Sequence, residues 1–395
     1  MKKVLTLLWK SLAAAVLFAF AASFALSVSP IYRFGEPSPF EGPDIFNPYA
    51  GLDTAIGWKR ANFHTHTRVK GLFNECEYRA DEVYARFADF GYDIVTFSNH
   101  NELTENPVSP SLQVNVYEHG LNLFKYHKLV FGCDGVLYFD HLFPFLASQR
   151  QWIIDMLGKN ADFIQLNHPA RTNFTTRHIM ECLTGYRITE LDSGRTTEQE
   201  YWDWALSAGH YTFGLANDDL HYPDRSDRFA VRCNWLNAES ASYHDIRKTL
   251  LSGAYYSMRV PDFGDGDWTV KKEMNARLPE VTEIGVRSDT VYMSLSRKAE
   301  LVKAYGQNHT VLDTLADADN YVYVLGADEP YVRLSARFED GTVIYTNPFA
   351  RYDNSIARDP YRETEHTVNW FLTILFNIFA LGLAALCIRL MARLF

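Results

Sequence analysis

The order of apolar and polar positions divides the chain into segments of three kinds. Residues 11–28 form an unbroken run of 18 apolar or small residues, and residues 368–391 are apolar apart from three positions. A helix needs about 20 apolar residues to cross a bilayer, so both runs predict transmembrane helices. Between them, short apolar runs alternate first with helical stretches and later with turn residues.

Residues 61–262 alternate between strand-like and helix-like patterns. The predicted strands cover residues 61–65, 94–98, 129–132, 163–167, 188–191 and 212–216. The predicted helices cover residues 81–90, 150–159, 198–208 and 243–252. Such alternation is typical of α/β proteins, so we expect an α/β barrel-like domain here.

Residues 263–350 have a different pattern, in which short β-type runs are separated by turn residues. These runs occupy residues 281–286, 290–294, 301–305, 320–325, 331–338 and 343–346. Spacing of about 8–12 residues predicts a small antiparallel β-sandwich. The expected order is an N-terminal apolar segment (1–29), a proline-rich linker (30–60), the barrel (61–262), the sandwich (263–350), a second linker (351–366) and a C-terminal transmembrane helix (367–391).

Basic residues flank the outer end of each apolar run, namely Lys2, Lys3, Lys10, Arg389 and Arg393. Positive charge stays on the cytoplasmic side of a membrane, so we expect both termini in the cytoplasm. The bulk of the chain would then lie outside, in the periplasm or at the cell surface. For residues 1–29 the alternative is a cleaved signal peptide, since Ser23-Phe24-Ala25 offers a small-x-small cleavage site.

Charge and cysteine content narrow the choice of partners. The net charge of −10 argues against nucleic acid, because phosphate backbones require a basic face. An anionic substrate would need local arginines instead. The five cysteines do not have the spacing of a metal-binding motif. The four outside the C-terminal apolar run either pair in disulfide bonds or are buried free thiols.

Histidines mark the ends of the first two predicted strands. His64 and His66 are two residues apart, so their side chains point to the same face of a strand and can reach one ion. His100 follows the next strand. Further ligand-type residues follow later strands: Glu118, His127, His168, Asp219 and His221. Imidazoles and carboxylates in this number suit two or three divalent ions, and Zn, Mn or Fe fit such donors.

The motif order is similar to that of the PHP family, the polymerase and histidinol phosphatase domain. The motifs that carry the resemblance are His64-x-His66, Ser98-Asn99-His100, Glu118, His127, Asn167-His168-Pro169 and Asp219-x-His221, with Glu190 and Trp202-Asp203 as further elements. The resemblance covers about residues 60–262. The runs 331–333 and 346–348 look like the sandwich-bearing branch, which includes carbamate-hydrolase-like members.

This resemblance implies a distorted (β/α)7 barrel with metal ions at one mouth, and phosphoester hydrolysis as the usual reaction. It implies eight metal ligands, with Glu118 bridging: His64, His66, His100, Glu118, His127, His168, Asp219 and His221. Two positions depart from the family pattern. Lys70 stands where an acidic stretch is usual, which predicts two ions rather than three, and Asn99 replaces an acidic residue.

Four residues are candidates for contacting substrate. Arg171 follows His168 on one loop, and its guanidinium suits a phosphate; Arg195 is a weaker candidate of the same kind. Lys70 would contact phosphate as a point cation, and Asp219, or a histidine that is not fully engaged by metal, would protonate the leaving group. The metals would activate the attacking water.

The expected function is therefore that of a membrane-anchored, extracytoplasmic metal-dependent phosphoesterase. With the barrel held close to a membrane, we expect a phosphorylated small molecule, a lipid head group or an envelope phosphoester as substrate. The alternatives are an amide, ester or carbamate hydrolase of the same fold, and a metal-stabilised binding or assembly module without activity.

Overall fold

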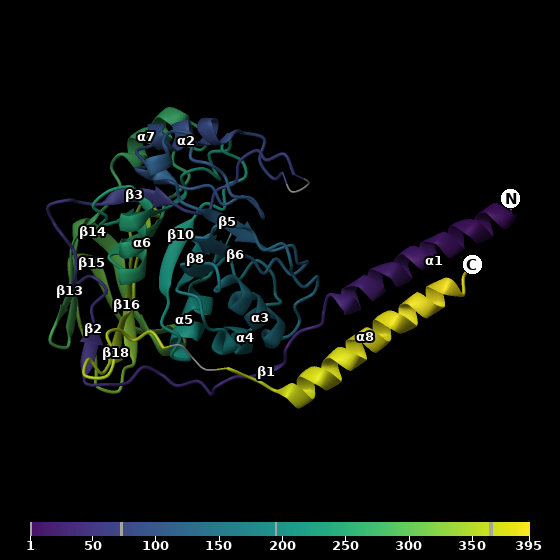
Figure 1. The fold of residues 1–395 in the computed structure, drawn as a ribbon. Helices are drawn as coiled ribbons and strands as arrows, with labels where there is room; N and C mark the ends of the chain where they lie inside the picture. The colour runs from purple at the N-terminus through teal and green to yellow at the C-terminus, as the bar shows by residue number, and fades with distance from the viewer. Residues whose placement is uncertain (1, 72–73, 194–195, 363–365) are drawn as a thin grey trace.

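Two long helices project from a body of sheets and helices in the computed structural model, which describes residues 2–71, 74–193, 196–362 and 366–395 (Figure 1). The helices are α1 (Lys2–Ala25) and α8 (Trp370–Ala392), and each is long and apolar enough to cross a membrane. They lie side by side and antiparallel, so both chain ends lie at the same far end.

The first helix differs in its bounds from the predicted span. It begins at Lys2 and ends at Ala25, whereas the apolar run covers residues 11–28. The lysines before the run are good helix formers with apolar stems, so the helix extends through them. The chain that leaves α1 continues along α8 toward the first residues of that helix. The Ser29 N–H donates to Asn377 Oδ1 (3.0 Å), and the Ile31 N–H donates to Thr373 Oγ1 (2.9 Å).

The first sheet of the body carries most of the motif residues. Its strand order is β10 (Phe213–Asn217), β8 (Ile188–Ser193), β7 (Phe163–Leu166), β6 (Lys128–Phe131) and β5 (Val116–His119). β9 (Thr196–Thr197) pairs with β8 outside this order. β10, β8 and β7 are parallel, whereas β6 is antiparallel to both of its neighbours.

The orientation of β6 departs from the strict strand–helix alternation that we predicted. Residues 120–127 join β5 to β6 without a helix. Eight residues are too few for the crossover that parallel strands need, so β5 and β6 can only be antiparallel. The four predicted helices between residues 81 and 252 are confirmed as α2 (Ala80–Asp89), α3 (Ala147–Leu157), α5 (Gln199–Ser207) and α6 (Tyr243–Ser252).

The second sheet joins early and late parts of the chain. Its main order is β13 (Val281–Arg287), β14 (Thr290–Gly306), β16 (Tyr331–Arg337), β17 (Val343–Thr346), β12 (Tyr255–Arg259), β11 (Arg232–Leu236), β3 (Lys59–Asn62) and β4 (Ile94–Val95). β15 (Thr310–Val324) pairs with β14, while β18 (Phe349–Tyr352) pairs with β16 and with β2 (Asp44–Phe46). Away from both sheets, β1 (Tyr32–Arg33) pairs with β19 (Thr367–Val368). The pattern did not reveal β11, β12, α4 (Arg177–Cys182) or α7 (Trp268–Asn275).

The sheet continues across the boundary predicted at residue 262. β12 pairs with β17, so the strands of the predicted sandwich share hydrogen bonds with strands of the predicted barrel. A buried ion pair adds to this contact, since Arg333 on β16 donates through Nε to Asp203 Oδ1 on α5 (2.8 Å). The division into barrel and sandwich stays a prediction, and the two parts pack as one body.

Two isolated bridges connect the edges of the two sheets near the motif residues. Thr65 pairs with Leu220 and His100 pairs with Glu118, both in parallel orientation. The first bridge joins the chain after β3 to the chain after β10, and the second joins the chain after β4 to β5. The ends of these strands, which carry the candidate ligands, are thereby brought to one place.

Candidate metal centre

Glu118, at the end of β5, lies fully buried among five imidazoles. Its Oε1 lies 3.2 Å from His64 Nε2, 3.0 Å from His127 Nδ1 and 3.2 Å from His168 Nε2. Its Oε2 lies 3.2 Å from His66 Nε2 and 3.1 Å from His100 Nε2. These side chains come from the ends of several strands, as an active site at a barrel mouth would require.

Asp219 supplies a second buried carboxylate beside the first histidines. Its Oδ1 lies 3.2 Å from His64 Nε2 and 3.5 Å from His66 Nε2. Its Oδ2 accepts a hydrogen bond from Arg171 Nη1 at 2.5 Å. The two carboxylates therefore face the same pair of imidazoles from different strands.

Several of these buried atoms have no hydrogen-bond partner among the described residues: His64 Nε2, His66 Nε2 and Glu118 Oε2. They lie about 3.2 Å from donor or acceptor atoms without the geometry of a hydrogen bond. Bonds of about 2.1 Å to one tetrahedral ion place its ligand atoms about 3.4 Å apart. Because unpaired buried polar atoms are costly, this spacing fits a metal ion better than a metal-free core.

The potential ligand atoms fall into overlapping groups. The groups are His64, His66, Glu118 and Asp219; His100, Glu118 and His127; His66, Glu75 and His221; and His64, His168 and Glu190. Glu118 belongs to two of them, as a bridging carboxylate would. The cluster thus fits divalent metal ions by donor type, burial and spacing.

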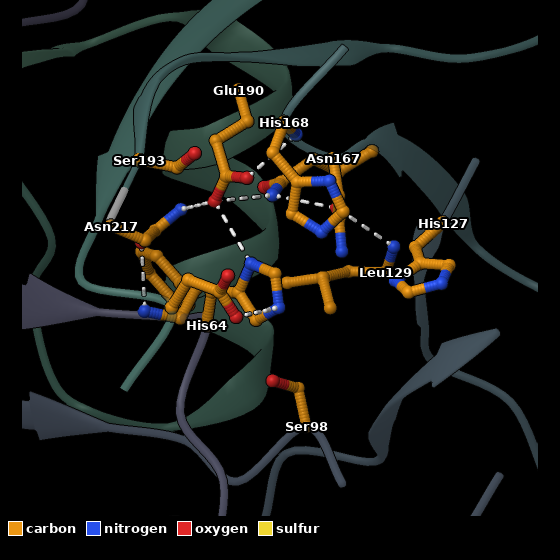
Figure 2. Close-up of polar contacts among 12 residues, drawn as sticks. His64, Ser98, His127, Leu129, Asn167, His168, Glu190, Ser193 and Asn217 are labelled. Atoms are coloured by element: carbon orange, nitrogen blue, oxygen red, sulfur yellow. Dashed lines mark hydrogen bonds and ion pairs between the residues drawn. The ribbon is translucent and has the colours of Figure 1, made fainter. Parts of the chain in front are cut away.

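Glu190 orients a ligand more than it offers one. Figure 2 shows its carboxylate between His64 and His168, with Oε1 3.0 Å from His64 Nδ1 and Oε2 accepting from the His168 N–H at 2.9 Å. A hydrogen bond at Nδ1 fixes the tautomer that leaves Nε2 free for a metal. We therefore assign Glu190 to the second layer of the site, although it lies near two ligand candidates.

Amide side chains hold the central carboxylate and the loops in place. Asn167 donates through Nδ2 to Glu118 Oε1 (2.9 Å) and accepts from the Leu129 N–H (3.1 Å), so it ties β7 to β6 (Figure 2). Asn99, where the family pattern has an acid, accepts from the Thr67 N–H at 2.7 Å. Asn99 thereby fixes the loop after His66, and an uncharged amide is sufficient for this hydrogen bond.

Glu75 is a functional candidate that the sequence did not reveal. Its Oε2 lies 3.0 Å from His100 Nε2 and 3.1 Å from His221 Nε2. Lys70, which we expected at this position, has an exposed side chain, whereas Glu75 reaches two of the imidazoles. The family pattern predicts an acidic residue near position 70, and in this chain Glu75 offers a carboxylate to the cluster instead. The one available signal was the acidic sequence Asn74-Glu75-Cys76-Glu77, which lies in an irregular segment.

The electrostatics of the cluster suit a cation. Burial raises the pKa of Glu118, but the surrounding imidazoles of His100, His64 and His127 together lower it by more, so the carboxylate stays ionised. Burial lowers the pKa of His127 to about 3, which keeps this imidazole neutral. Burial also raises the pKa of Glu75, and its hydrogen bonds to His100 and His221 lower it by more. Burial lowers the pKa of His64 and of His100, but Glu118 and other carboxylates raise it by more, so a bound metal ion would displace protons from these two imidazoles.

The backbone is strained at two candidate ligands. His168 has φ 25° and Asp219 has φ 47°, in the left-handed region that non-glycine residues rarely adopt. Gly120 has φ 148°, and a Cβ there would lie 2.3 Å from His127 Cδ2. Only glycine therefore allows the β5–β6 connection to pass this close to the His127 ring.

All eight predicted ligands lie together in the structure, and their role as ligands stays a prediction. Arg171 reaches the same site through Asp219, and its side chain is 36% exposed, so a substrate can approach it. Lys70 is exposed, so its role as a phosphate contact stays a prediction, and Arg195 lies outside the described residues.

Comparisons with known proteins give little further guidance. No protein-family model and no curated protein matches the sequence. Among solved structures, the chain is similar to a two-domain protein from Bacteroides vulgatus ATCC 8482 that is described as containing a predicted PHP-like metal-dependent phosphoesterase. The identity is 15% and the TM-score 0.39, over 80% of this chain and 99% of the other. The function proposed below therefore rests on the geometry of the site and on the motifs.

Proposed function

We propose that this protein is a membrane-anchored, metal-dependent phosphoesterase with a distorted PHP-type barrel. The observation that supports it most is Glu118, a buried carboxylate among five imidazoles, where Glu118 Oε2, His64 Nε2 and His66 Nε2 have no hydrogen-bond partner among the described residues. A non-catalytic scaffold would have no need for so many unpaired ligand atoms near an exposed arginine. The two isolated bridges between the sheets support the barrel.

The overlapping groups suggest which residues would hold the ions. Two ions would share Glu118, one with His64, His66 and Asp219 and the other with His100 and His127. The prediction of only two ions rested on Lys70 and did not include the carboxylate of Glu75. We propose a third ion at His66, Glu75 and His221.

Bound divalent ions would supply an activated water and neutralise charge on the phosphoryl oxygens. The protein's own contribution is to position substrate and ligands. Arg171, held by Asp219 at the exposed side of the cluster, would bind a non-bridging oxygen of the phosphate. Because both oxygens of Asp219 face other groups, this residue is better suited to holding an ion and Arg171 than to protonating the leaving group.

The two projecting helices support a membrane-bound protein. Polar contacts from Ser29 and Ile31 to α8 pack the chain after α1 against that helix, so we propose that α1 is retained as an anchor. Both termini would then be cytoplasmic, and a lipid head group or envelope phosphoester would be within reach. Labelling of single tags at residue 1 and residue 395 in intact cells tests this topology, because labelling of either tag from outside contradicts it.

A panel of chromogenic substrates tests the reaction. The full-length protein, loaded with Mn, Zn or Fe, should hydrolyse bis-p-nitrophenyl phosphate or p-nitrophenyl phosphate, and Glu118→Gln should abolish this. Glu273→Gln, an exposed carboxylate on α7, serves as the matched control. Turnover of p-nitrophenyl acetate alone would instead indicate the carbonyl chemistry of the alternative hydrolase. Bound metal without turnover of any ester would indicate a binding module.

A further inference from the structure

Exposed apolar side chains gather on the loops that carry the candidate metal ligands and on the neighbouring loop after β6. Phe145 is 66% exposed and Phe174 is 48% exposed, although both are large aromatic residues. The large apolar residues that are exposed in the segments following β4, β5, β6, β7 and β10 are Val108, Leu123, Tyr138, Phe145, Leu146, Phe174 and Tyr222. Apolar exposure concentrated beside a functional site marks an interaction surface.

The centre of this surface is an aromatic patch, which we define as the exposed Leu123, Phe145, Leu146 and Phe174 together with the half-buried Phe143 and the buried Phe124 on which they pack. The rings of Phe124 and Phe174 are stacked with centroids 3.8 Å apart, and the Phe145 ring lies 4.8 Å from that of Phe124. These residues come from three loops, so the patch is a feature of the folded protein and not of one segment.

Arg150 on α3 holds the loops of the patch in a fixed arrangement. It is fully buried, and it donates to the Pro144 carbonyl (3.0 Å), the Phe174 carbonyl (2.8 Å) and Thr175 Oγ1 (3.0 Å). Its guanidinium also lies over the ring of Tyr126, 4.8 Å from the centroid. The exposed rings are thus presented on a rigid frame.

Residues on either side of Phe145 in the sequence contact the chain that leaves α1. His141 donates through Nδ1 to the Leu26 carbonyl (2.6 Å), and Gln149 donates through Nε2 to the Ser27 carbonyl (3.0 Å). Phe145 is four residues from each of these contacts. Figure 1 shows the same side of the body facing the two long helices.

The pairing of α1 with α8 indicates how deep in a membrane the contacts to Leu26 and Ser27 would lie. Ser29 lies level with Asn377, which is seven residues after Trp370, or roughly 10 Å along the helix axis. Leu26 and Ser27 are further still from the body end of α8. Tryptophan prefers the membrane–water interface, so we place the bilayer surface at the level of Trp370. The contacts of His141 with Leu26 and of Gln149 with Ser27 then lie on the membrane side of that surface.

The patch is also next to the candidate metal centre. Phe124 lies in the connection between Glu118 and His127, and its carbonyl accepts from Thr172 Oγ1 at 2.8 Å. Thr172 follows Arg171, the candidate phosphate-binding residue. Exposed Lys125 beside Phe124 adds the basic charge that favours an anionic membrane surface.

We propose that the aromatic patch inserts into the interface of the bilayer that α1 and α8 span, and that it turns the mouth of the metal centre toward the lipid head groups. This inference rests on the proposed membrane anchoring and deepens the proposed function. The substrate would be a phosphoester carried by a membrane lipid, which reaches Arg171 and the metal cluster from the head-group layer.

Photocrosslinking in lipid nanodiscs tests the insertion without any need for turnover. p-Benzoylphenylalanine is placed in the full-length protein at position 145 or 174, and lipid adducts are detected by mass spectrometry. Ile378 on α8 is the positive control, and Val322 on β15, on the opposite side of the body from α1 in Figure 1, is the negative control. We expect adducts at 145, 174 and 378 and none at 322. Adducts at 378 without adducts at 145 and 174 would overturn the proposal.

A second measurement tests the orientation of the site. The double substitution Phe145→Ser and Phe174→Ser should lower turnover of a phospholipid phosphoester in nanodiscs about tenfold and leave turnover of soluble bis-p-nitrophenyl phosphate unchanged. An equal loss of turnover on both substrates would contradict the proposal that the aromatic patch turns the metal centre toward the membrane. If no ester is hydrolysed at all, the proposed function fails while the crosslinking result still decides the insertion.

Discussion

Glu75 Oε2 lies 3.1 Å from His221 Nε2, although 146 positions separate the two residues in the sequence. The same oxygen lies 3.0 Å from His100 Nε2, so one side chain on an irregular segment joins loops that follow β4 and β10. This contact gives the cluster a carboxylate at its exposed edge, where the sequence showed only Lys70.

Substitution of Glu75 should change the metal content. Glu75→Ala removes the only carboxylate of the group it forms with His66 and His221, so about one ion per chain should be lost. Lys70→Ala should leave the content unchanged, because Lys70 is exposed and outside the groups. Metal content is measured by mass spectrometry of the purified protein. Equal metal content in the Glu75→Ala protein and the unmodified protein would exclude a third site here.

The eight ligand candidates could be found from the sequence because each of them lies at or near a strand end. Periodicity alone predicts that His64 and His66 point to the same side of an extended chain, although β3 itself ends at Asn62, and parallel strands bring such ends together. Glu75 could not be found, because no periodic element indicates where residues 74–79 lie. Its position depends on packing against loops far away in the sequence.

The fold was predictable to a similar extent. Tyr243–Ser252 begins after an N-cap serine and ends at Gly253 in the left-handed conformation, so its bounds follow from local signals. The continuation of the sheet from β12 to β17 could not be predicted, because strand pairing across some 85 residues leaves no local signature. The segments 290–294 and 301–305 likewise form one strand, β14, since the polar residues between them still pair with β15 or stay extended.

Loss of the first two histidines should remove at least one ion. The double substitution His64→Ala and His66→Ala takes two nitrogens from the group that includes Glu118 and Asp219, which leaves too few ligands to retain a metal. Hydrolysis should then fall to background. His244→Ala, an exposed histidine on α6, is the control. Full metal content in the double variant would show that His64 and His66 have a structural role.

Arg171 should affect turnover and not metal content. We expect Arg171→Ala to lower kcat by about 100-fold, the usual loss when a donor to the transition state is removed. The control is Arg177→Ala, whose guanidinium bonds Glu181 and Asn308 away from the cluster. A loss of metal in the Arg171→Ala protein would mean instead that Arg171 acts by holding Asp219 in place.

The ion pair between Asp203 and Arg333 should hold the two parts of the body together. Asp203→Asn leaves Arg333 buried without its charged partner and should cost about 3–5 kcal/mol in the free energy of unfolding. Burial raises the pKa of Asp203, but Arg333 and then His309 lower it by more. The stability that this carboxylate contributes is therefore present above its unfolded value, near pH 4, and is lost as pH falls below it.

Denaturant unfolding at several pH values checks this. The difference between Asp203→Asn and the unmodified protein should be constant at neutral pH and should shrink below about pH 4. Two separate transitions in the unmodified protein, one for residues up to 262 and one for the remainder, would contradict a single packed body.

The central claim is that the cluster around Glu118 binds divalent ions that enable phosphoester hydrolysis. Its most direct test is reconstitution: the full-length protein is stripped with a chelator, then titrated with Mn, Zn or Fe while hydrolysis of bis-p-nitrophenyl phosphate and bound metal are recorded together. We predict no activity after stripping and a rise that follows metal occupancy, saturating at about two to three ions per chain, with neither binding nor activity in Glu118→Ala. Hydrolysis that persists without metal, or that is unchanged in Glu118→Ala, would contradict the claim.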